Sequence, residues 1–206
     1  MNMNKSRILR QATFKMVFLF VTIISVNLSI KASDFVVDKT ASQVKWEAKK
    51  VTGKHNGTIA VSNGVLSADK TGITGGTLVI DMKTIVDVDL TDAGYNAKLT
   101  GHLKSDDFFA VEKFPESKLV VKKVTSVSGN DYKFAGDLTI KGVTNPIEFT
   151  AKVTQNGETL NAEGIMTINR AKFGVKFGSS SFFENLGDKV IYDDFTLTFN
   201  ITALKK

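Results

Sequence analysis

The sequence predicts an all-β fold in which about eight antiparallel strands form a barrel or a sandwich, accompanied by one short helix. Apolar and polar residues alternate along nearly all of residues 34–206, as they do in strands with one buried face. Glycine, asparagine and aspartate recur at short intervals between these runs, which is typical of tight turns between antiparallel neighbours. One segment instead repeats its apolar residues every four positions. Alternation alone does not choose between a barrel and a sandwich.

The first half of the chain contains four predicted strands. Residues 44–48 alternate between apolar and charged side chains, and a similar pattern returns after Gly57. Asn63-Gly64 predicts a hairpin turn, because both residues accept the positive φ angles that two-residue turns need. A glycine-rich bend is expected over residues 71–76. We therefore expect strands around residues 44–48, 57–61, 65–68 and 78–82.

The second half shows the alternation more cleanly. Residues 128–131 and the pair Asn156-Gly157 predict tight turns, and Asn145-Pro146 predicts the start of a strand. Because such turns are short, consecutive strands are expected to be antiparallel neighbours. We expect strands around residues 119–124, 134–140, 147–153, 160–170 and 195–201.

The segment that breaks the two-residue period lies between Leu90 and Leu103. Here Tyr95, Leu99 and Leu103 recur every four residues, as the apolar face of a helix does. We therefore expect one short helix around residues 90–103.

The first 33 residues have the layout of a cleavable signal peptide. Four basic residues precede an apolar run over residues 16–30, which is short for a membrane span and is interrupted by Asn27 and Ser29. Small residues place cleavage at Ala32 or Ser33. We therefore expect a periplasmic or secreted protein with one domain over residues 34–206 and no permanent membrane span. A retained N-terminal anchor is the alternative.

The charge distribution argues against nucleic acid as a partner. The chain has 27 lysine and arginine residues against 21 aspartate and glutamate residues, but five of the basic residues and none of the acidic ones precede residue 34. The mature chain is therefore nearly neutral. There is no cysteine, which excludes disulfides and an N-terminal lipid-modified cysteine. Because the chain also has no nucleophile elbow or phosphate-binding loop, we expect no enzymatic activity and no cofactor.

Phenylalanine is abundant, and many of the 15 phenylalanines lie near predicted bends. Small barrels either fill their interior with side chains or enclose one ligand. Aromatic residues at strand ends would suit an apolar cavity with a closed mouth, whereas an ordinary core built from the same residues is the alternative. The candidate ligand-binding residues of this kind are Phe108, Phe109, Phe114 and Phe173. Trp46, the sole tryptophan, is a further candidate because it shares a strand face with Val44 and Ala48, and it would belong to the core, the cavity wall or both.

Three long motifs resemble those of one known family. They are His102-Leu-Lys-Ser-Asp-Asp-Phe-Phe109 followed by Lys113-Phe-Pro115, Gly136-Asp-Leu-Thr-Ile-Lys-Gly-Val-Thr-Asn-Pro-Ile147, and Asn169-Arg-Ala-Lys-Phe-Gly174. In this order and spacing they are similar to the motifs of the YceI-like family of bacterial polyisoprenoid-binding proteins, and the resemblance extends over residues 34–203.

The resemblance implies a lipocalin-like antiparallel barrel in the periplasm that holds a long isoprenoid lipid and has no catalytic activity. The implied ligands are polyprenyl phosphates, isoprenoid quinones or similar amphiphiles, and a homodimer is compatible with this picture. An alternative is a stress-response or interaction module whose barrel is filled by its own side chains. Many members carry an Arg-Asp pair before the His-Leu element, where this chain has Asn96-Ala-Lys98, and this difference leaves the polar end of the lipid open.

Arg170 is a candidate contact for that polar end. It is the only arginine outside the predicted signal peptide and has the same strand parity as Leu160 and Ile168. If the strand keeps its register, the guanidinium points inward, where an unpaired charge costs several kcal/mol. It would then bind the ligand or pair with a carboxylate such as Asp106 or Asp107.

The two histidines are His55 and His102. His102 lies at the edge of the predicted apolar helix face, where it would contact the polar end of the lipid or form an ordinary buried hydrogen bond. His55 lies close to two glycines and is expected to shape a turn. The two histidines lack a third ligand at a metal-binding spacing, so no metal site is expected.

Overall fold

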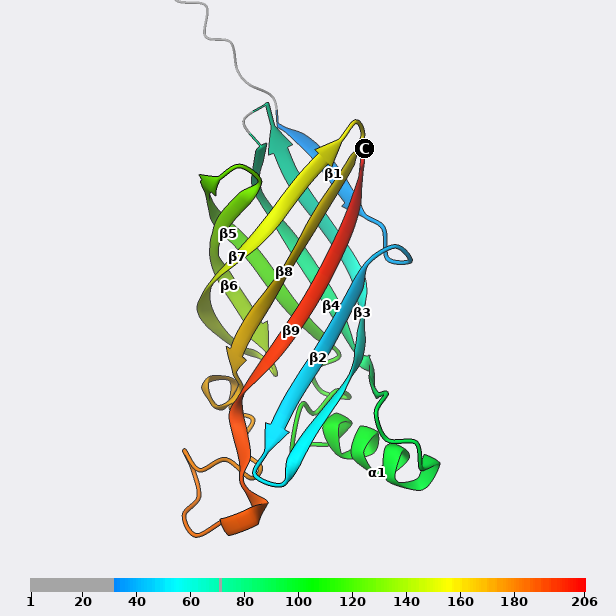
Figure 1. Ribbon diagram of the computed structural model, residues 1–206, viewed down its shortest axis with the longest axis vertical. Coiled ribbons are helices and arrows are strands. Elements are labelled where there is room, and N and C mark those ends of the chain that lie inside the picture. Colours follow the sequence, from blue (N-terminus) through cyan, green and yellow to red (C-terminus); the bar gives the residue numbers. More distant parts are fainter. Residues whose placement is uncertain (1–31, 71) are drawn as a thin grey trace, which may run out of the picture.

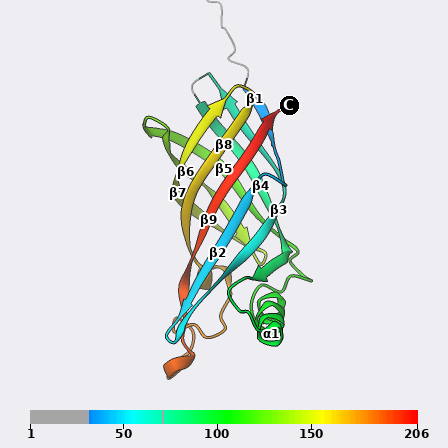
Figure 2. The same cartoon turned by 45° about the vertical axis from the view of Figure 1, so that its right-hand side comes forward.

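The computed structural model describes residues 32–70 and 72–206, which form an elongated antiparallel barrel with a helix at one end (Figures 1 and 2). The strands are β1 (Ser33–Val37), β2 (Gln43–Lys50), β3 (Gly53–Asp69), β4 (Gly72–Asp87), β5 (Glu116–Ser128), β6 (Asp131–Ile140), β7 (Val143–Asn156), β8 (Thr159–Asn169) and β9 (Ile191–Lys205). The helices are α1 (Ala93–Lys104) and two short 3-10 helices, η1 (Arg170–Phe173) and η2 (Gly187–Lys189).

Eight strand positions close the barrel. Neighbours run from β2 through β9, β8, β7, β6, β5 and β4 to β3, which pairs again with β2. The strands β1 and β2 occupy one position in succession, since both pair with β3 and β9, with β2 nearer to α1. Asp38 holds the break between them by accepting hydrogen bonds from the amides of Thr40 (2.9 Å) and Ala41 (3.1 Å). The prediction of an all-β antiparallel barrel of about eight strands with one helix is confirmed.

Alternation along the strands places one face of each inside the barrel. On β8, the predicted inward row of Leu160, Ala162, Met166 and Ile168 is buried. Leu160 lies opposite Ala203 of β9, and together with Phe35 of β1 these side chains fill the barrel end away from α1, each at most 1% exposed. These packed side chains therefore close the barrel interior toward this end.

The hairpin turn predicted at Asn63-Gly64 is wrong. Strand β3 continues through both residues and pairs with β4, with an irregularity in register between Val61 and Asn63. The Asn63 side chain accepts a hydrogen bond from the Gly64 amide (2.7 Å), and a Cβ atom on Gly64 would lie 2.6 Å from Cγ2 of Val37. The glycine therefore provides space for a neighbouring strand and does not reverse the chain.

The predicted helix is present, but it begins three residues later than expected. Asp92 caps its first turn by accepting a hydrogen bond from the Tyr95 amide (2.9 Å). The amide of Leu90 instead donates to the Asp87 carboxylate (2.9 Å), which holds the preceding segment out of the helix. Leu103 is buried, whereas Tyr95 is 68% exposed and does not belong to the buried face.

The predicted signal peptide lies almost entirely outside the described residues. Ser33 is already part of the barrel, where it pairs with Ala68 of β3. Within residues 32–70 and 72–206, no helix has both the length and the apolar character that crossing a membrane requires.

Candidate functional site

The barrel encloses a cavity of about 180 Å³. All eight strand positions contribute inward side chains to its wall, and they do so because alternation turns every second residue of each strand inward. Leu103 of α1 and the following residues Phe108 and Phe109 complete the wall at the helix end. The cavity therefore lies between the packed end of the barrel and a cover built by α1 and its following loop.

The cavity wall is almost entirely hydrocarbon. Aromatic rings from three strands meet there: Phe134 stacks on Phe149 at 5.1 Å, and Phe149 meets the edge of Phe199 at 5.9 Å. The hydroxyl of Ser117, a polar group on this wall, lies 3.0 Å from Sδ of Met82. A molecule in the cavity would therefore meet an apolar surface.

The cover at the helix end is held by backbone hydrogen bonds and aromatic contacts. The amides of Phe109 and Val111 donate to the carbonyls of the last turn of α1 (3.2 Å and 3.0 Å). Outside Phe108, the rings of His102 and Phe177 lie 4.9 Å and 5.6 Å from its centroid, and Phe177 is 43% exposed. Phe108 thus separates the cavity from an aromatic surface that reaches solvent.

Arg170 lies on the cavity wall, but its guanidinium is already hydrogen-bonded within the protein. Its three nitrogens donate to the carbonyls of Tyr192 (3.2 Å), Val175 (2.9 Å) and Ile191 (2.9 Å). Its carboxylate partner is Asp193 at 3.4 Å, so the expected pairing with Asp106 or Asp107 is wrong.

The position of Arg170 in the chain explains why it pairs with Asp193. Arg170 is the first residue of η1 and so follows the end of β8, which places its side chain beside the start of β9. The two aspartates that were expected as partners lie on the loop after α1, where Asp106 pairs with Lys113 and Asp107 lies 3.4 Å from His102.

The seven candidate ligand-binding residues fall into two groups. Trp46, Phe108, Phe109 and Arg170 line the cavity, whereas His102, Phe114 and Phe173 do not. His102 packs outside Phe108. Phe114 lies against Gly142 of the β6–β7 turn, where a Cβ atom would be 2.6 Å from its ring, and Phe173 is buried in η1.

Several aromatic wall residues lie within strands and were not among the predicted site residues. Phe149, Phe195 and Phe199 line the cavity from β7 and β9. The alternation of β9 contained this signal, because Phe195, Leu197, Phe199 and Ile201 all share one parity. All three residues belong to predicted strands and not to the bends on which the predicted aromatic candidates lie.

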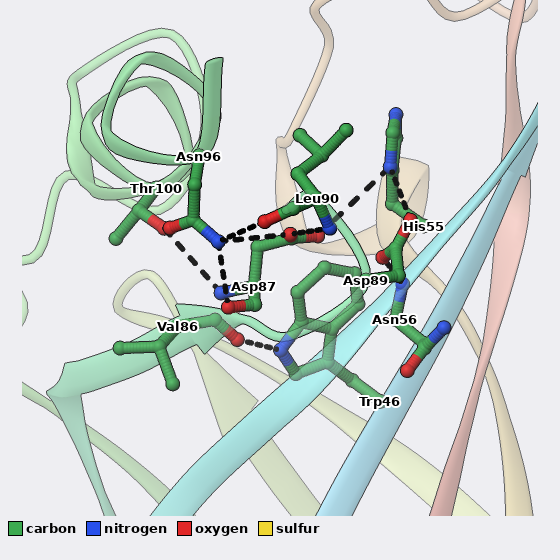
Figure 3. A network of polar contacts seen from close by, with 9 residues as sticks. All are labelled: Trp46, His55, Asn56, Val86, Asp87, Asp89, Leu90, Asn96 and Thr100. Atoms are coloured by element: carbon green, nitrogen blue, oxygen red, sulfur yellow. Dashed lines mark hydrogen bonds and ion pairs between the residues drawn. The ribbon is translucent and has the colours of Figure 1, made fainter. Parts of the chain in front are cut away.

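A second polar cluster lies at the helix end, where β3 begins and β4 ends (Figure 3). Nδ1 of His55 lies 3.0 Å from Oδ2 of Asp89 and 3.9 Å from Oδ2 of Asp87. Burial raises the pKa of Asp87, against the lowering effect of the hydrogen bond from the Leu90 amide. For Asp89, the raising effect of burial is outweighed by hydrogen bonds, first that from the Asn56 amide, and its pKa is lowered.

Trp46 connects this cluster to the cavity wall. The Trp46 side chain extends from β2 across β3, and its indole Nε1 donates to the carbonyl of Val86 on β4 (3.2 Å). Its ring also lines the cavity. The crossing is possible because Gly57 lies beneath the ring: a Cβ atom there would be 1.9 Å from the Val86 oxygen and 2.7 Å from the indole.

The sequence of this chain matches one known protein family. The family profile described as "YceI-like domain" matches residues 11–203. A UPF0312 protein of Staphylococcus aureus is 39% identical over 94 residues, which are 41% of this chain and about half (51%) of that protein's length. A UPF0312 protein of Pseudomonas putida is 28% identical over 154 residues, covering 70% of this chain and 78% of the relative.

Solved structures share the fold. BcnA of Burkholderia cenocepacia superposes with a TM-score of 0.65 at 25% identity, covering 81% of this chain and 99% of BcnA. A polyisoprenoid-binding domain from Saccharophagus degradans, implicated in plant cell wall breakdown, has a TM-score of 0.61 at 14% identity, covering 85% of this chain and all of that domain (100%).

Proposed function

This chain belongs to the YceI-like family, and on that basis we propose that it is an exported binding protein that holds a long apolar isoprenoid-type lipid in its barrel. Polyprenyl phosphates, isoprenoid quinones and amphiphiles of similar shape form the ligand class. The likeness in fold to a polyisoprenoid-binding domain supports a ligand of this kind.

The hydrocarbon cavity with an internally satisfied Arg170 is the observation that carries the proposal. Because the guanidinium already serves three carbonyls, affinity comes from burying the chain of the ligand. Removing about 400 Å² of lipid surface from water, at roughly 25 cal/mol per Å², contributes on the order of 10 kcal/mol before the costs of association. The polar end of the ligand then contributes orientation more than affinity.

The cavity volume indicates how much of a lipid fits. A water-sized group needs on the order of 10–15 Å³ on the same scale, so 180 Å³ accommodates roughly a dozen such groups in a row. A longer isoprenoid would have to displace the cover at Phe108 and Phe109 or extend past it. We therefore propose that the cover at the helix end is where the lipid passes in and out.

Export of the protein remains part of the proposal. The basic and apolar segments within residues 1–33 support a signal peptide, with cleavage at Ala32 or Ser33 and a periplasmic or secreted mature protein. The nearly neutral mature chain fits an uncharged or amphiphilic ligand better than nucleic acid. A homodimer would not alter this picture.

Organic extraction and mass spectrometry of protein purified from its native host test the proposal directly. We expect a reproducible isoprenoid-type lipid at a ratio near one per barrel. We also expect isoprenoid quinone or prenyl phosphate to raise the thermal midpoint of the extracted protein by mass action. An empty barrel with an unchanged midpoint would instead favour the interaction module filled by its own side chains.

A cavity-filling substitution provides a sharper test. Ala162 of β8 is buried on the cavity wall, while its neighbour Glu163 is exposed on the outer face. We expect Ala162→Met to reduce lipid content and to abolish most of the ligand-dependent rise in thermal midpoint. Glu163→Met should leave both unchanged. Equal lipid content in the two variants would contradict binding inside the cavity.

A further inference from the structure

Three ligand-type side chains converge outside the cavity, at the helix end of the β3–β4 pair (Figure 3). His55 belongs to β3, Asp87 is the last residue of β4, and Asp89 follows it by two positions. The pairing of Gly57 with Asp87 brings the two strands together at this point. The donor atoms of the three side chains all lie within 4.8 Å of one another.

Each carboxylate has one oxygen held in place and one turned toward His55. Oδ1 of Asp87 accepts hydrogen bonds from the Leu90 amide (2.9 Å) and the Asn96 side chain (3.2 Å). Oδ1 of Asp89 accepts one from the Asn56 amide (2.7 Å). The Oδ2 atoms are left to face Nδ1 of His55. Such outer hydrogen bonds are how proteins orient ligands around a metal ion.

Oδ2 of Asp87 is one of two buried side-chain oxygens that lack a hydrogen-bond partner among the described residues; the other, Oδ1 of Asp193, has the Arg170 guanidinium 3.4 Å away. The Asp87 side chain is fully buried (0% exposed), and with both carboxylates ionised this oxygen has no hydrogen-bond partner among the described residues. At 3.9 Å, His55 is too far to donate to it. Lys54, the basic residue next to His55 in the chain, is paired with Glu47 (2.8 Å). A buried carboxylate oxygen without a partner is costly, so this geometry favours a bound positive group.

The spacing of the donor atoms suits a small divalent ion. Two atoms bound to one ion at about 2.0–2.2 Å, with an angle near 90–110°, lie about 3–3.5 Å apart. The distances from Nδ1 of His55 to the two Oδ2 atoms, 3.0 Å and 3.9 Å, approach that range, so small side-chain rotations would complete it. His55 and Asp89 are 27% and 30% exposed, which leaves room for water in the remaining coordination positions.

We infer that Nδ1 of His55 and the Oδ2 atoms of Asp87 and Asp89 form a binding site for one divalent transition-metal ion of the zinc or manganese class. The imidazole favours such ions over magnesium and calcium, which prefer oxygen ligands alone. The site is separate from the lipid cavity, because none of its three residues lines it.

A bound ion would fasten the cover of the barrel. Asp87 also contacts α1: its amide donates to Thr100 (3.3 Å), and its carbonyl accepts from Asn96 (3.1 Å). Cross-linking Asp87 to Asp89 and to β3 through one ion would hold the segment between β4 and α1 in place. The ion is therefore structural, and it stabilises the end of the barrel at which the cavity is covered.

Zinc titration of the purified protein tests the inference. The protein is prepared without a polyhistidine tag, stripped with a chelator and titrated calorimetrically with zinc chloride, then with manganese and magnesium chloride. We expect one zinc ion per chain, weaker binding of manganese, and the weakest binding of magnesium. Zinc should also raise the thermal midpoint of the stripped protein.

Two single substitutions distinguish this site from unspecific zinc binding. Asp89→Asn keeps the oxygen that accepts from Asn56 but removes a charged ligand, so zinc should bind at least about 10-fold more weakly. Asp107→Asn is the control, because it alters the other histidine–aspartate pair, that of His102 and Asp107. This pair does not belong to a group of three potential metal ligands among the described residues. The control substitution should leave zinc affinity unchanged.

His55→Gln serves as a second variant if Asp89→Asn does not fold, and it should lose zinc binding to a similar degree. Absence of stoichiometric zinc binding to the unmodified protein would overturn the inference. Oδ2 of Asp87 would then be satisfied by a proton shared with Asp89. Equal zinc affinity of the unmodified protein and both cluster variants would overturn the inference as well.

Discussion

The cavity and the His55–Asp87–Asp89 cluster each contain one buried charged residue, and the two residues are treated in opposite ways. Arg170 on the cavity wall donates to three backbone carbonyls and lies beside Asp193. Asp87 in the cluster has one oxygen satisfied and the other without a partner among the described residues. The charge of Arg170 therefore stabilises the fold, whereas the charge of Asp87 is available to a ligand.

This difference indicates two kinds of ligand for two neighbouring regions. In the cavity, the guanidinium of Arg170 is satisfied internally and binding depends on apolar area. In the cluster, two carboxylates and an imidazole face one another and binding depends on charge. Trp46 belongs to both regions, because its ring lines the cavity while its Nε1 donates to the residue before Asp87.

The largest expected effect is that of Arg170→Leu. Removing the guanidinium leaves three carbonyls and Asp193 without their partner, so the free energy of unfolding should fall by about 3–5 kcal/mol in urea denaturation without ligand. Arg170→Lys should lose most of this stability too, since one ammonium group does not span the same three acceptors. Near-normal stability together with weakened lipid binding would contradict the structural role of Arg170 and show that it binds the ligand.

A smaller effect is expected from Gly57→Ala, which alters the point where the two regions meet. The added Cβ atom would lie 1.9 Å from the Val86 oxygen, so the β3–β4 pair and Trp46 must shift, at a cost of about 2–3 kcal/mol in unfolding free energy. The fluorescence of Trp46, the sole tryptophan, should change as well.

Gly101→Ala is the matched control for that substitution. A Cβ atom at Gly101 of α1 meets nothing within 4 Å, and alanine favours a helix over glycine by about 0.5–1 kcal/mol. The control should therefore be slightly more stable than the unmodified protein. Equal destabilisation by both substitutions would show that the close contact at Gly57 is not the cause.

The smallest effect is expected from Asp87→Asn in metal-free protein. Asparagine retains Oδ1 as the acceptor for Leu90 and replaces the unpartnered Oδ2 by a donor, so the free energy of unfolding should stay unchanged or rise by up to about 1 kcal/mol. Zinc should no longer raise the thermal midpoint. A loss as large as that of Arg170→Leu would remove the contrast between the two buried charges.

Local patterns predicted most of the strands but not all of the breaks between them. The turns at residues 128–131 and at Asn156-Gly157 lie where the sequence predicted them, because each needs only its own residues to form. Asn63-Gly64 has the same turn chemistry, yet the chain continues straight, since pairing with β4 and packing against Val37 outweigh the local preference.

Candidate residues were predicted best where alternation alone decided their orientation. Trp46 reaches the cavity because its strand parity points inward. The assignment of Phe114 and Phe173 to the ligand site rested on their nearness to bends, and bends do not specify a direction. Their places against Gly142 and within η1 depend on segments that are distant in the sequence or irregular.

The amino-acid sequence determined the all-β class, the inward apolar rows and the position of the helix, because alternation and capping act over a few residues. The partner of Arg170 and the meeting of His55 with Asp87 and Asp89 were decided by the tertiary structure. The contacts of Arg170 with Asp193 and of His55 with Asp89 span 23 and 34 residues of chain, and they follow from the register in which β9 lies beside β8 and β4 lies beside β3. Register is a property of the closed barrel, in which every strand must satisfy two neighbours at once.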